Sequence, residues 1–150
     1  MPEDHPRIDV TVDVVALTEV VAQLRLLVVR RGNPPYEGQW ALPGGYLEVD
    51  EDLAAGAARE LHEETGIAVH PAELHQVGAF GEPDRDPRNR TISVAFLLEL
   101  DRPIEVEGAD DAAEASWRPV DELMQGGLAF DHEAIVAEAV DISRWATDRH

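Results

Sequence analysis

Residues 45–67 read GYLEVDEDLAAGAARELHEETGI, and the end of this stretch has three glutamates at helix-neighbour spacing, with an arginine before them and a glycine after them. Glu60, Glu63 and Glu64 stand at i, i+3 and i+4, so a helix gathers their side chains on one face. Like charges at this spacing oppose one another by roughly 0.2–0.5 kcal/mol per pair. The last turn before Gly66 also places them at the negative end of the helix dipole. A hard divalent cation, which takes carboxylate oxygens as ligands, is the expected compensation.

The stretches around this helix predict an α/β fold. Val10–Leu17 and Leu24–Arg31 are β-branched and almost continuously apolar, which is typical of buried strands. Pro43-Gly44-Gly45 predicts a turn that brings backbone close to a ligand. Gly81–Arg90 (GEPDRDPRNR) predicts a long polar loop, which is a candidate functional segment. Further strands are predicted at Gln39–Leu42, Leu74–Phe80, Thr91–Leu100 and Ala115–Val120.

Three helical segments accompany these strands. Asp50 is the predicted N-cap of the glutamate helix, which Thr65-Gly66 ends in the usual way. Asp121–Gln125 predicts a single helical turn, and Asp131–Ala146 predicts a C-terminal amphipathic helix. Strands that alternate with two separated long helices predict a mixed sheet covered by helices on both faces.

Composition narrows the class of protein and its partners. At 150 residues the chain is expected to form one domain, residues 1–150, with residues 1–8 as a polar N-terminal arm. A net charge of −19 disfavours nucleic acids and anionic membranes as partners. The chain has no cysteine, which excludes disulfides, thiolate nucleophiles and cysteine-based zinc sites. No apolar run approaches the roughly 20 residues that span a bilayer, and no secretory signal is recognisable, so a cytoplasmic location is expected.

The glutamate helix and its flanks resemble the Nudix hydrolase signature without departure. That signature is a glycine, five residues, a glutamate, seven residues, and then Arg-Glu-aliphatic-any-Glu-Glu-any-Gly-aliphatic. The matching residues are Gly45, Glu51, Arg59, Glu60, Leu61, Glu63, Glu64, Gly66 and Ile67. The resemblance implies an α/β/α sandwich and metal-dependent hydrolysis of a nucleoside diphosphate linked to another group.

The resemblance also implies a role for each signature residue. Mg²⁺ or Mn²⁺ neutralises charge on the diphosphate oxygens and makes a water nucleophilic. The implied metal ligands are the carboxylates of Glu60, Glu63 and Glu64 and the backbone carbonyl of Gly45. Arg59 is expected on another face of the helix, paired with Glu51, where the pair pins the loop and orients the glutamates.

The resemblance implies that the general base lies outside the signature, on a loop near the metals. The acidic run ADDAAEASW offers Asp110, Asp111 and Glu114, and Glu114 is our choice because it closes the run just ahead of Trp117. The alternatives are that Glu114 is an ordinary surface carboxylate, or that Glu63 activates the water instead.

The flanking sequences are similar to the bacterial ADP-ribose pyrophosphatase branch of the family. The resemblance rests on RRGNPPYEGQWALPGG, FGEPDRDPRNRTISVAF, AEASWRPVDEL and LAFDH. It implies that ADP-ribose and water give AMP and ribose 5-phosphate. Arginine forks match phosphate oxygens, so the expected substrate-binding residues are Arg30, Arg85, Arg88 and Arg90. The alternative for the loop arginines is internal pairing with Glu82, Asp84 and Asp86.

Several other side chains remain open. Arg31 stands beside Arg30 at the end of a strand, and one of the two is expected to face the phosphates. Tyr36, Trp40 and Phe80 are possible stacking surfaces for adenine, although aromatic residues in so small a protein more often belong to the core. His132 can start the last helix and face the site, but capping or packing is the more common role, so none is assigned.

Three other functions compete with this prediction. The same chemistry can serve nucleoside triphosphates or oxidised nucleotides, which the signature does not distinguish. The ADP-ribose-like branch also resembles the Nudix domain of transcription regulators that sense a ligand and carry a DNA-binding domain after it; with the sequence ending at His150, none is expected here. A metal-binding interaction protein without turnover is the third. Many relatives are dimers, so a homodimer is left open.

Overall fold

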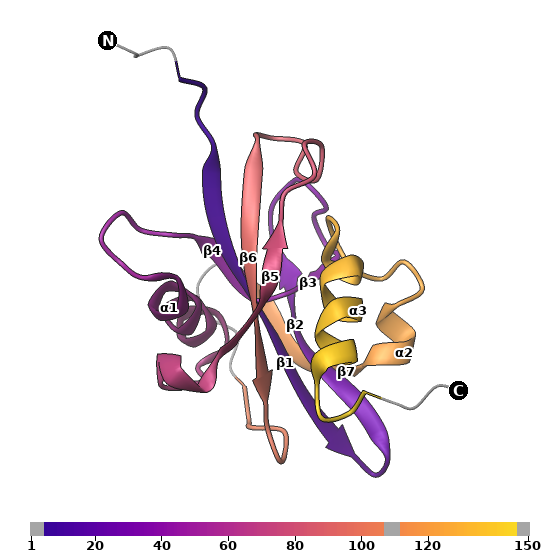
Figure 1. Cartoon of the computed structure of the whole chain (residues 1–150). Helices are drawn as coiled ribbons and strands as arrows, with labels where there is room; N and C mark the ends of the chain where they lie inside the picture. The colour runs from indigo at the N-terminus through magenta and orange to yellow at the C-terminus, as the bar shows by residue number, and fades with distance from the viewer. Residues whose placement is uncertain (1–4, 107–111, 147–150) are drawn as a thin grey trace.

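The computed structural model describes residues 5–106 and 112–146, and within them a mixed seven-stranded sheet forms the centre of the molecule (Figure 1). The strands are β1 (Asp9–Val20), β2 (Gln23–Arg31), β3 (Trp40–Ala41), β4 (Gly44–Tyr46), β5 (His75–Phe80), β6 (Thr91–Glu99) and β7 (Ala112–Pro119). Their order is β3-β2-β1-β6-β5, while β4 pairs with β1 and β7 pairs with β2. β1 and β6 run parallel, and β1 pairs antiparallel with both β2 and β4.

Helices cover both faces of this sheet, as the sequence predicts. They are α1 (Leu53–Thr65), the short 3₁₀ helix η1 (Pro71–Glu73), α2 (Val120–Leu123) and α3 (His132–Ile142). Figure 1 shows α1 on one side of the sheet and α2 with α3 on the other. Successive side chains of β1 point to opposite faces. Val12, Val14 and Ala16 therefore join the core under α1, whereas Val15 and Leu17 join the core under α3.

Helix α1 begins two residues later than predicted. Asp50 is not its N-cap; Asp52 is, and the Asp52 carboxylate accepts the Leu53 N–H at 2.8 Å. The physical reason is that the residue between them, Glu51, is held outside the helix by Arg59. The predicted end is confirmed, since Gly66 adopts φ 81° and donates its N–H to the His62 carbonyl.

The segment 40–46 also differs from the prediction. The expected strand Gln39–Leu42 is reduced to Trp40–Ala41, and the expected turn at Pro43-Gly44-Gly45 leads directly into strand β4. Gly44 pairs with Asp13 of β1, and a side chain at Gly44 would meet the Val12 carbonyl oxygen 2.2 Å from its Cβ. Backbone contact with β1 therefore replaces the open turn that the glycines suggested.

The C-terminal helices are shorter than predicted. α2 occupies Val120–Leu123 instead of Asp121–Gln125, and α3 ends at Ile142 instead of Ala146 because Ser143 is extended. Of the acidic run considered for the general base, Asp110 and Asp111 lie outside the described residues. None of the helices in the described ranges has the length and apolar character that crossing a bilayer requires.

Candidate active site

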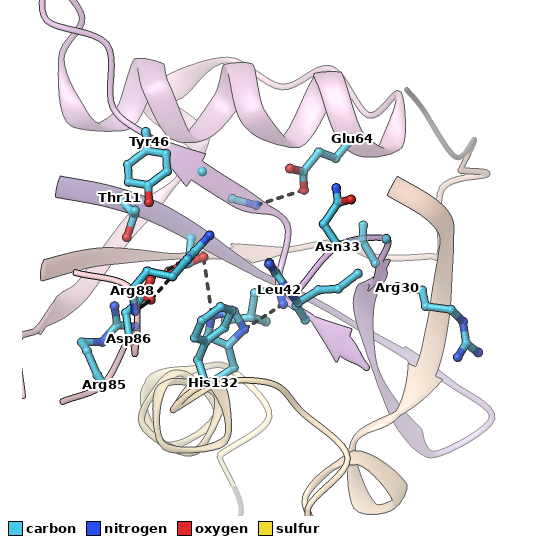
Figure 2. A pocket seen from close by; sticks show the side chains of 18 residues that line it. Thr11, Arg30, Asn33, Leu42, Tyr46, Glu64, Arg85, Asp86, Arg88 and His132 are labelled. Atoms are coloured by element: carbon cyan, nitrogen blue, oxygen red, sulfur yellow. Dashed lines mark hydrogen bonds and ion pairs between the residues drawn. The ribbon is translucent and has the colours of Figure 1, made fainter. Parts of the chain in front are cut away.

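A pocket of about 210 Å³ opens between α1, β1, β4, the end of β2, the loop 81–90 and the start of α3 (Figure 2). Its charged lining residues have both signs. The cationic ones are Arg30, Arg31, Arg85 and Arg88. The acidic ones are Asp13, Glu64 and Asp86. Such a pocket offers donors for phosphate oxygens next to carboxylates that suit a hard cation.

Arg59 organises the carboxylates of the α1 face. Its Nη2 and Nε donate to the two carboxylate oxygens of Glu51 at 2.6 and 2.9 Å, so the pair expected from the sequence is present. Its Nη1 donates to Glu60 at 2.9 Å and to Glu63 at 3.3 Å. The expectation that Arg59 points to another face of the helix is therefore wrong, because the long guanidinium side chain reaches all three carboxylates.

The electrostatics of this cluster follow from these contacts. The Arg59 guanidinium holds the pKa of Glu51 at about 2, and the Glu48 N–H adds to this effect. Hydrogen bonding to Glu51 raises the pKa of Arg59 in turn, with Glu60 contributing. At neutral pH this part of the site is a fully ionised clamp between the loop that precedes α1 and the helix itself.

Glu64 lies on the pocket side of α1 without a cationic partner among the described residues. Its Oε1 accepts the Gly44 N–H at 3.2 Å (Figure 2). Burial raises the pKa of Glu64 to about 8, and the carboxylates of Glu60 and Asp13 add to the rise. Burial also raises the pKa of Glu60. Negative charge here is therefore short of compensation.

Gly45 of β4 lies next to the carboxylate of Glu60. A Cβ at Gly45 would lie 2.7 Å from the carboxylate of Glu60, so a side chain there would displace that carboxylate. As the side chains lie, no three acidic or histidine groups of the described residues converge on one point, because Arg59 holds Glu60 and Glu63. The donor chemistry nevertheless fits a divalent cation: the carboxylates of Glu60 and Glu64 face the Gly44–Gly45 backbone, which carries no side chain, and Glu63 lies on the same helix.

The loop arginines are mostly paired within the protein. Arg85 is buried and forms a fork on Asp131, at 2.9 and 2.6 Å, instead of pairing with Glu82 or Asp84. Arg88 forms a fork on Asp86 at 3.0 and 2.8 Å, as the internal-pairing alternative anticipated. Arg90 donates to the Gly81 carbonyl at 2.8 Å and does not line the pocket. Among these arginines, Arg88 keeps its exposed side chain at the pocket.

Arg31, beside the predicted Arg30, is the cation of β2 that faces the pocket interior. It makes no ion pair with a described residue, and its Nε donates to the Pro35 carbonyl at 2.7 Å. Burial, followed by repulsion from Arg88, lowers the pKa of Arg31. Both guanidinium groups lie near the Phe130 ring, at 4.9 Å for Arg31 and 5.5 Å for Arg88. An anion between them would relieve their repulsion.

Arg30 and Glu114 lie together at the edge of the site. Arg30 Nε donates to Glu114 Oε1 at 3.3 Å, and the Arg30 guanidinium lies 4.2 Å from the centre of the Trp40 ring. Glu114 belongs to strand β7, opposite Arg30 of β2, and does not line the pocket. The expected loop position of Glu114 is thus wrong, because β7 begins earlier than the sequence suggested.

The aromatic candidates have different environments. Trp40 lies between the guanidinium groups of Arg30 and Arg118, and Phe80 packs against the core under α3. Tyr36 is exposed and contacts Phe130 with ring centres 4.7 Å apart. None of the three candidates lines the pocket, whereas Phe130, which the sequence did not single out, does.

The sequence missed a buried polar group beneath the pocket. Asp13 of β1 accepts a hydrogen bond from Ser93 of β6, and His132 of α3 faces Asp13 with Nε2 at 3.8 Å from Oδ1. The signal for Asp13 was available: it is the one charged residue in the apolar strand VTVDVVAL. His132 was noted as facing the site, and it lines the pocket.

A mixed sheet between helices, with a glutamate helix beside an arginine-lined pocket, defines a pyrophosphohydrolase-like α/β protein. The family model described as NUDIX domain matches residues 8–139. The chain therefore belongs to the Nudix family.

Individual relatives include an enzyme and a regulator. An ADP-ribose pyrophosphatase from Methanocaldococcus jannaschii is 39% identical over 121 residues, which are 81% of this chain and 67% of that protein. The ADPR responsive transcriptional repressor NtrR from Acinetobacter baylyi is 33% identical over 138 residues, which are 91% of this chain and 54% of that protein. The chain thus spans about half to two thirds of the length of these relatives.

Solved structures show the same fold. The NUDIX domain of Shewanella oneidensis NrtR, in complex with ADP ribose, superposes with a TM-score of 0.84 at 28% identity, covering 94% of this chain and 92% of that one. A bifunctional NMN adenylyltransferase/ADP ribose pyrophosphatase from Francisella tularensis, in complex with AMP and a manganese ion, superposes with a TM-score of 0.79 at 32% identity. The match covers 94% of this chain and 43% of that one.

Proposed function

We propose that this chain is a metal-dependent pyrophosphohydrolase that converts ADP-ribose and water to AMP and ribose 5-phosphate. The observation that carries the proposal is the juxtaposition of Glu64, which has no cationic partner among the described residues, with Arg31 and Arg88 across one pocket. A divalent cation would compensate Glu64, and a diphosphate would accept from Arg31, which has no ion pair with a described residue, and from Arg88, which also pairs with Asp86. The similarity to an ADP-ribose pyrophosphatase and to an ADP-ribose-bound NUDIX domain supports the choice of substrate.

Glu60, Glu63, Glu64 and the Gly45 carbonyl are the residues that would hold Mg²⁺ or Mn²⁺. When bound, the metal supplies a Lewis acid for the diphosphate oxygens and lowers the pKa of a coordinated water. Arg59 and Glu51 hold the loop before α1 on the helix, so Gly45 and the glutamates keep their mutual positions. Release of Glu60 and Glu63 from Arg59 makes their oxygens available to a cation.

The remaining residues divide between binding and proton transfer. Arg31 and Arg88 would bind the diphosphate, since each has donors at the pocket. Arg30, at the rim, would contact the terminal part of the substrate, while Arg85 and Arg90 support the loop 81–90 by internal bonds. Glu63 and Glu114 both stay candidates for the general base: each accepts a hydrogen bond from an arginine at 3.3 Å, and neither lines the pocket.

Substrate screening tests this function. Purified protein is incubated with ADP-ribose, with nucleoside triphosphates and with oxidised nucleotides, each with Mg²⁺, and products are identified by chromatography. We expect AMP and ribose 5-phosphate from ADP-ribose, and a loss of at least about 100-fold in Glu63→Gln with the fold intact. Turnover of triphosphates without turnover of ADP-ribose would replace the substrate, and wild-type rates in Glu63→Gln would remove its role.

An ADP-ribose-sensing module is the second candidate, favoured by the similarity to NtrR and to the NUDIX domain of NrtR. The complete signature, with its glutamates and Arg59 in contact, favours turnover instead. Calorimetry separates the two: a sensor binds ADP-ribose stoichiometrically and leaves it intact after long incubation with Mg²⁺, whereas an enzyme consumes it.

A further inference from the structure

A row of buried polar side chains lies directly beneath the segment that leads into β4. His132, Asp13 and Ser93 come from α3, β1 and β6, and their exposed fractions are 5%, 6% and 0%. Burying three polar groups in a protein core costs free energy unless each finds a partner. Their partners therefore indicate what the row holds in place.

The hydrogen bonds of His132 define its tautomer. Nδ1 accepts the Leu42 N–H at 3.0 Å, so Nδ1 carries no proton, and the proton of the neutral ring is on Nε2 (Figure 2). Nε2 faces Asp13 Oδ1 at 3.8 Å, and the other Asp13 oxygen accepts the hydroxyl of Ser93. Burial lowers the pKa of His132, which keeps the ring neutral and keeps Nδ1 available as an acceptor.

The backbone that His132 holds is the one that meets the glutamates. Leu42 is followed by Pro43, whose carbonyl accepts the Val14 N–H at 2.9 Å, and then by Gly44, whose N–H donates to Glu64 at 3.2 Å. A Cβ on the next residue, Gly45, would lie 2.7 Å from the carboxylate of Glu60 and would displace it. The segment 42–45 is thus fixed from below by His132 and β1 and is in contact with α1 above.

Asp13 limits the position of the same segment. A Cβ at Gly44 would lie 2.4 Å from Asp13 Oδ1, so the carboxylate occupies the space beneath that glycine. The Ser93 hydroxyl in turn fixes the orientation of the carboxylate, and the His132 ring lies beside it. Both ring nitrogens of His132 face protein groups, which leaves no acceptor on the ring for a substrate.

We infer that His132 is a positioning residue that sets the divalent-metal affinity of the α1 glutamates by holding the Leu42–Gly45 backbone against them. This inference rests on the proposed metal role of Glu60 and Glu64. Replacing a residue that orients metal ligands without binding the metal typically lowers metal affinity or activity by about 10- to 100-fold.

Three variants test the role. His132→Phe keeps a ring of similar size but has no acceptor for Leu42. His132→Asn returns a side-chain oxygen. Val136→Ala removes buried volume one turn further along the same helix and leaves the hydrogen bond of His132 to Leu42 in place. Mn²⁺ affinity without substrate, thermal melting, and kcat and KM with ADP-ribose are measured for each. We expect His132→Phe to weaken Mn²⁺ binding by about 10-fold or more, with kcat falling more than KM rises.

The controls separate positioning from packing. His132→Asn is expected to recover part of the Mn²⁺ affinity. Val136→Ala is expected to lower the melting temperature and to leave the Mn²⁺ affinity unchanged. A His132→Phe protein that melts early but binds Mn²⁺ as the wild type does would overturn the inference. If that variant does not fold, Ser93→Ala decides: metal binding weaker by at least about threefold supports the role, and unchanged binding overturns it.

The same data distinguish this inference from the substrate proposal. If the wild-type protein binds Mn²⁺ but leaves ADP-ribose intact, the substrate proposal is wrong. The inference about His132 is then decided by the Mn²⁺ affinities of the variants alone. Normal ADP-ribose turnover with unchanged metal affinity in both His132 variants removes the inference alone. Absence of Mn²⁺ binding in the wild type overturns both.

Discussion

Replacing Glu51 by glutamine is expected to destabilise the fold by about 2 kcal/mol at neutral pH and by almost nothing at acid pH. In the wild type, Glu51 accepts hydrogen bonds from Arg59 at 2.6 and 2.9 Å and from the Glu48 N–H at 2.9 Å. Glutamine has nearly the same shape and keeps one acceptor oxygen. The substitution therefore removes the charge of the pair and leaves the packing in place.

The magnitude follows from the titration of Glu51. Its pKa falls from 4.5 to about 2, mainly through the hydrogen bonds from Arg59. A fall of about 2.5 corresponds to roughly 3.4 kcal/mol at 1.36 kcal/mol for each pH unit. The Glu51 side chain is 14% exposed and that of Arg59 is 23% exposed. Solvent screening at this depth reduces the expected value to about 2 kcal/mol.

The direction of the pH dependence is fixed by the sign of this change. Because the pKa of Glu51 is lower in the folded state, its stabilisation is present above the unfolded value near 4.5. It is lost as the pH falls from there toward 2. Urea unfolding of wild type and Glu51→Gln at a series of pH values gives the difference directly, and the other carboxylates cancel because both proteins share them.

Glu48→Gln is the matched control for this experiment. Glu48 lies 3.7 Å from Arg59 and its side chain is 60% exposed, so its loss is expected to cost less than about 0.5 kcal/mol. A stability gap between wild type and Glu51→Gln that stays constant from neutral to acid pH would refute the ionic explanation. If Glu51→Gln lowers the unfolding free energy at neutral pH by no more than Glu48→Gln does, the stabilising role of the Glu51–Arg59 pair is refuted.

Three further outcomes follow from the site. Glu64→Gln is expected to lower turnover by about 100-fold while far-ultraviolet circular dichroism stays unchanged; near-normal rates would exclude it as a metal ligand. Arg31→Ala is expected to raise KM about tenfold, the loss of one charge-assisted hydrogen bond, while Arg90→Ala leaves KM close to wild type; equal effects would contradict the assignment. Asp131→Asn is expected to cost about 3 kcal/mol in urea unfolding, because Arg85 is left buried without its counter-charge, and a loss below about 1 kcal/mol would argue against this.

The parts of the structure that were predictable depend on local rules. The buried strands and the end of α1 at Gly66 follow from apolar patterns and from the φ of a helix-ending glycine, whereas the pairing of Glu51 with Arg59 was implied by the resemblance to the Nudix signature. The start of α1 did not follow, because Asp50 and Asp52 are equally good caps in sequence. Only the ion pair of Glu51 decides between them.

The parts that were not predictable depend on contacts between distant segments. Arg85 pairs with Asp131, which lies 46 residues away, so nothing near Arg85 in the sequence identifies its partner. Glu114 was placed in a loop because the acidic run hides the start of β7. Asp13 is different: one carboxylate in an apolar strand is itself a signal that a buried partner exists.

The contrast between the whole-chain charge and the pocket bears on how an anionic substrate is bound. A net charge of −19 opposes the approach of a diphosphate. At physiological ionic strength, however, charges more than about 8 Å apart are largely screened in solvent. Arg31 and Arg88 act on a ligand at contact distance inside the pocket, where screening is weak. Recognition is therefore decided by groups in direct contact.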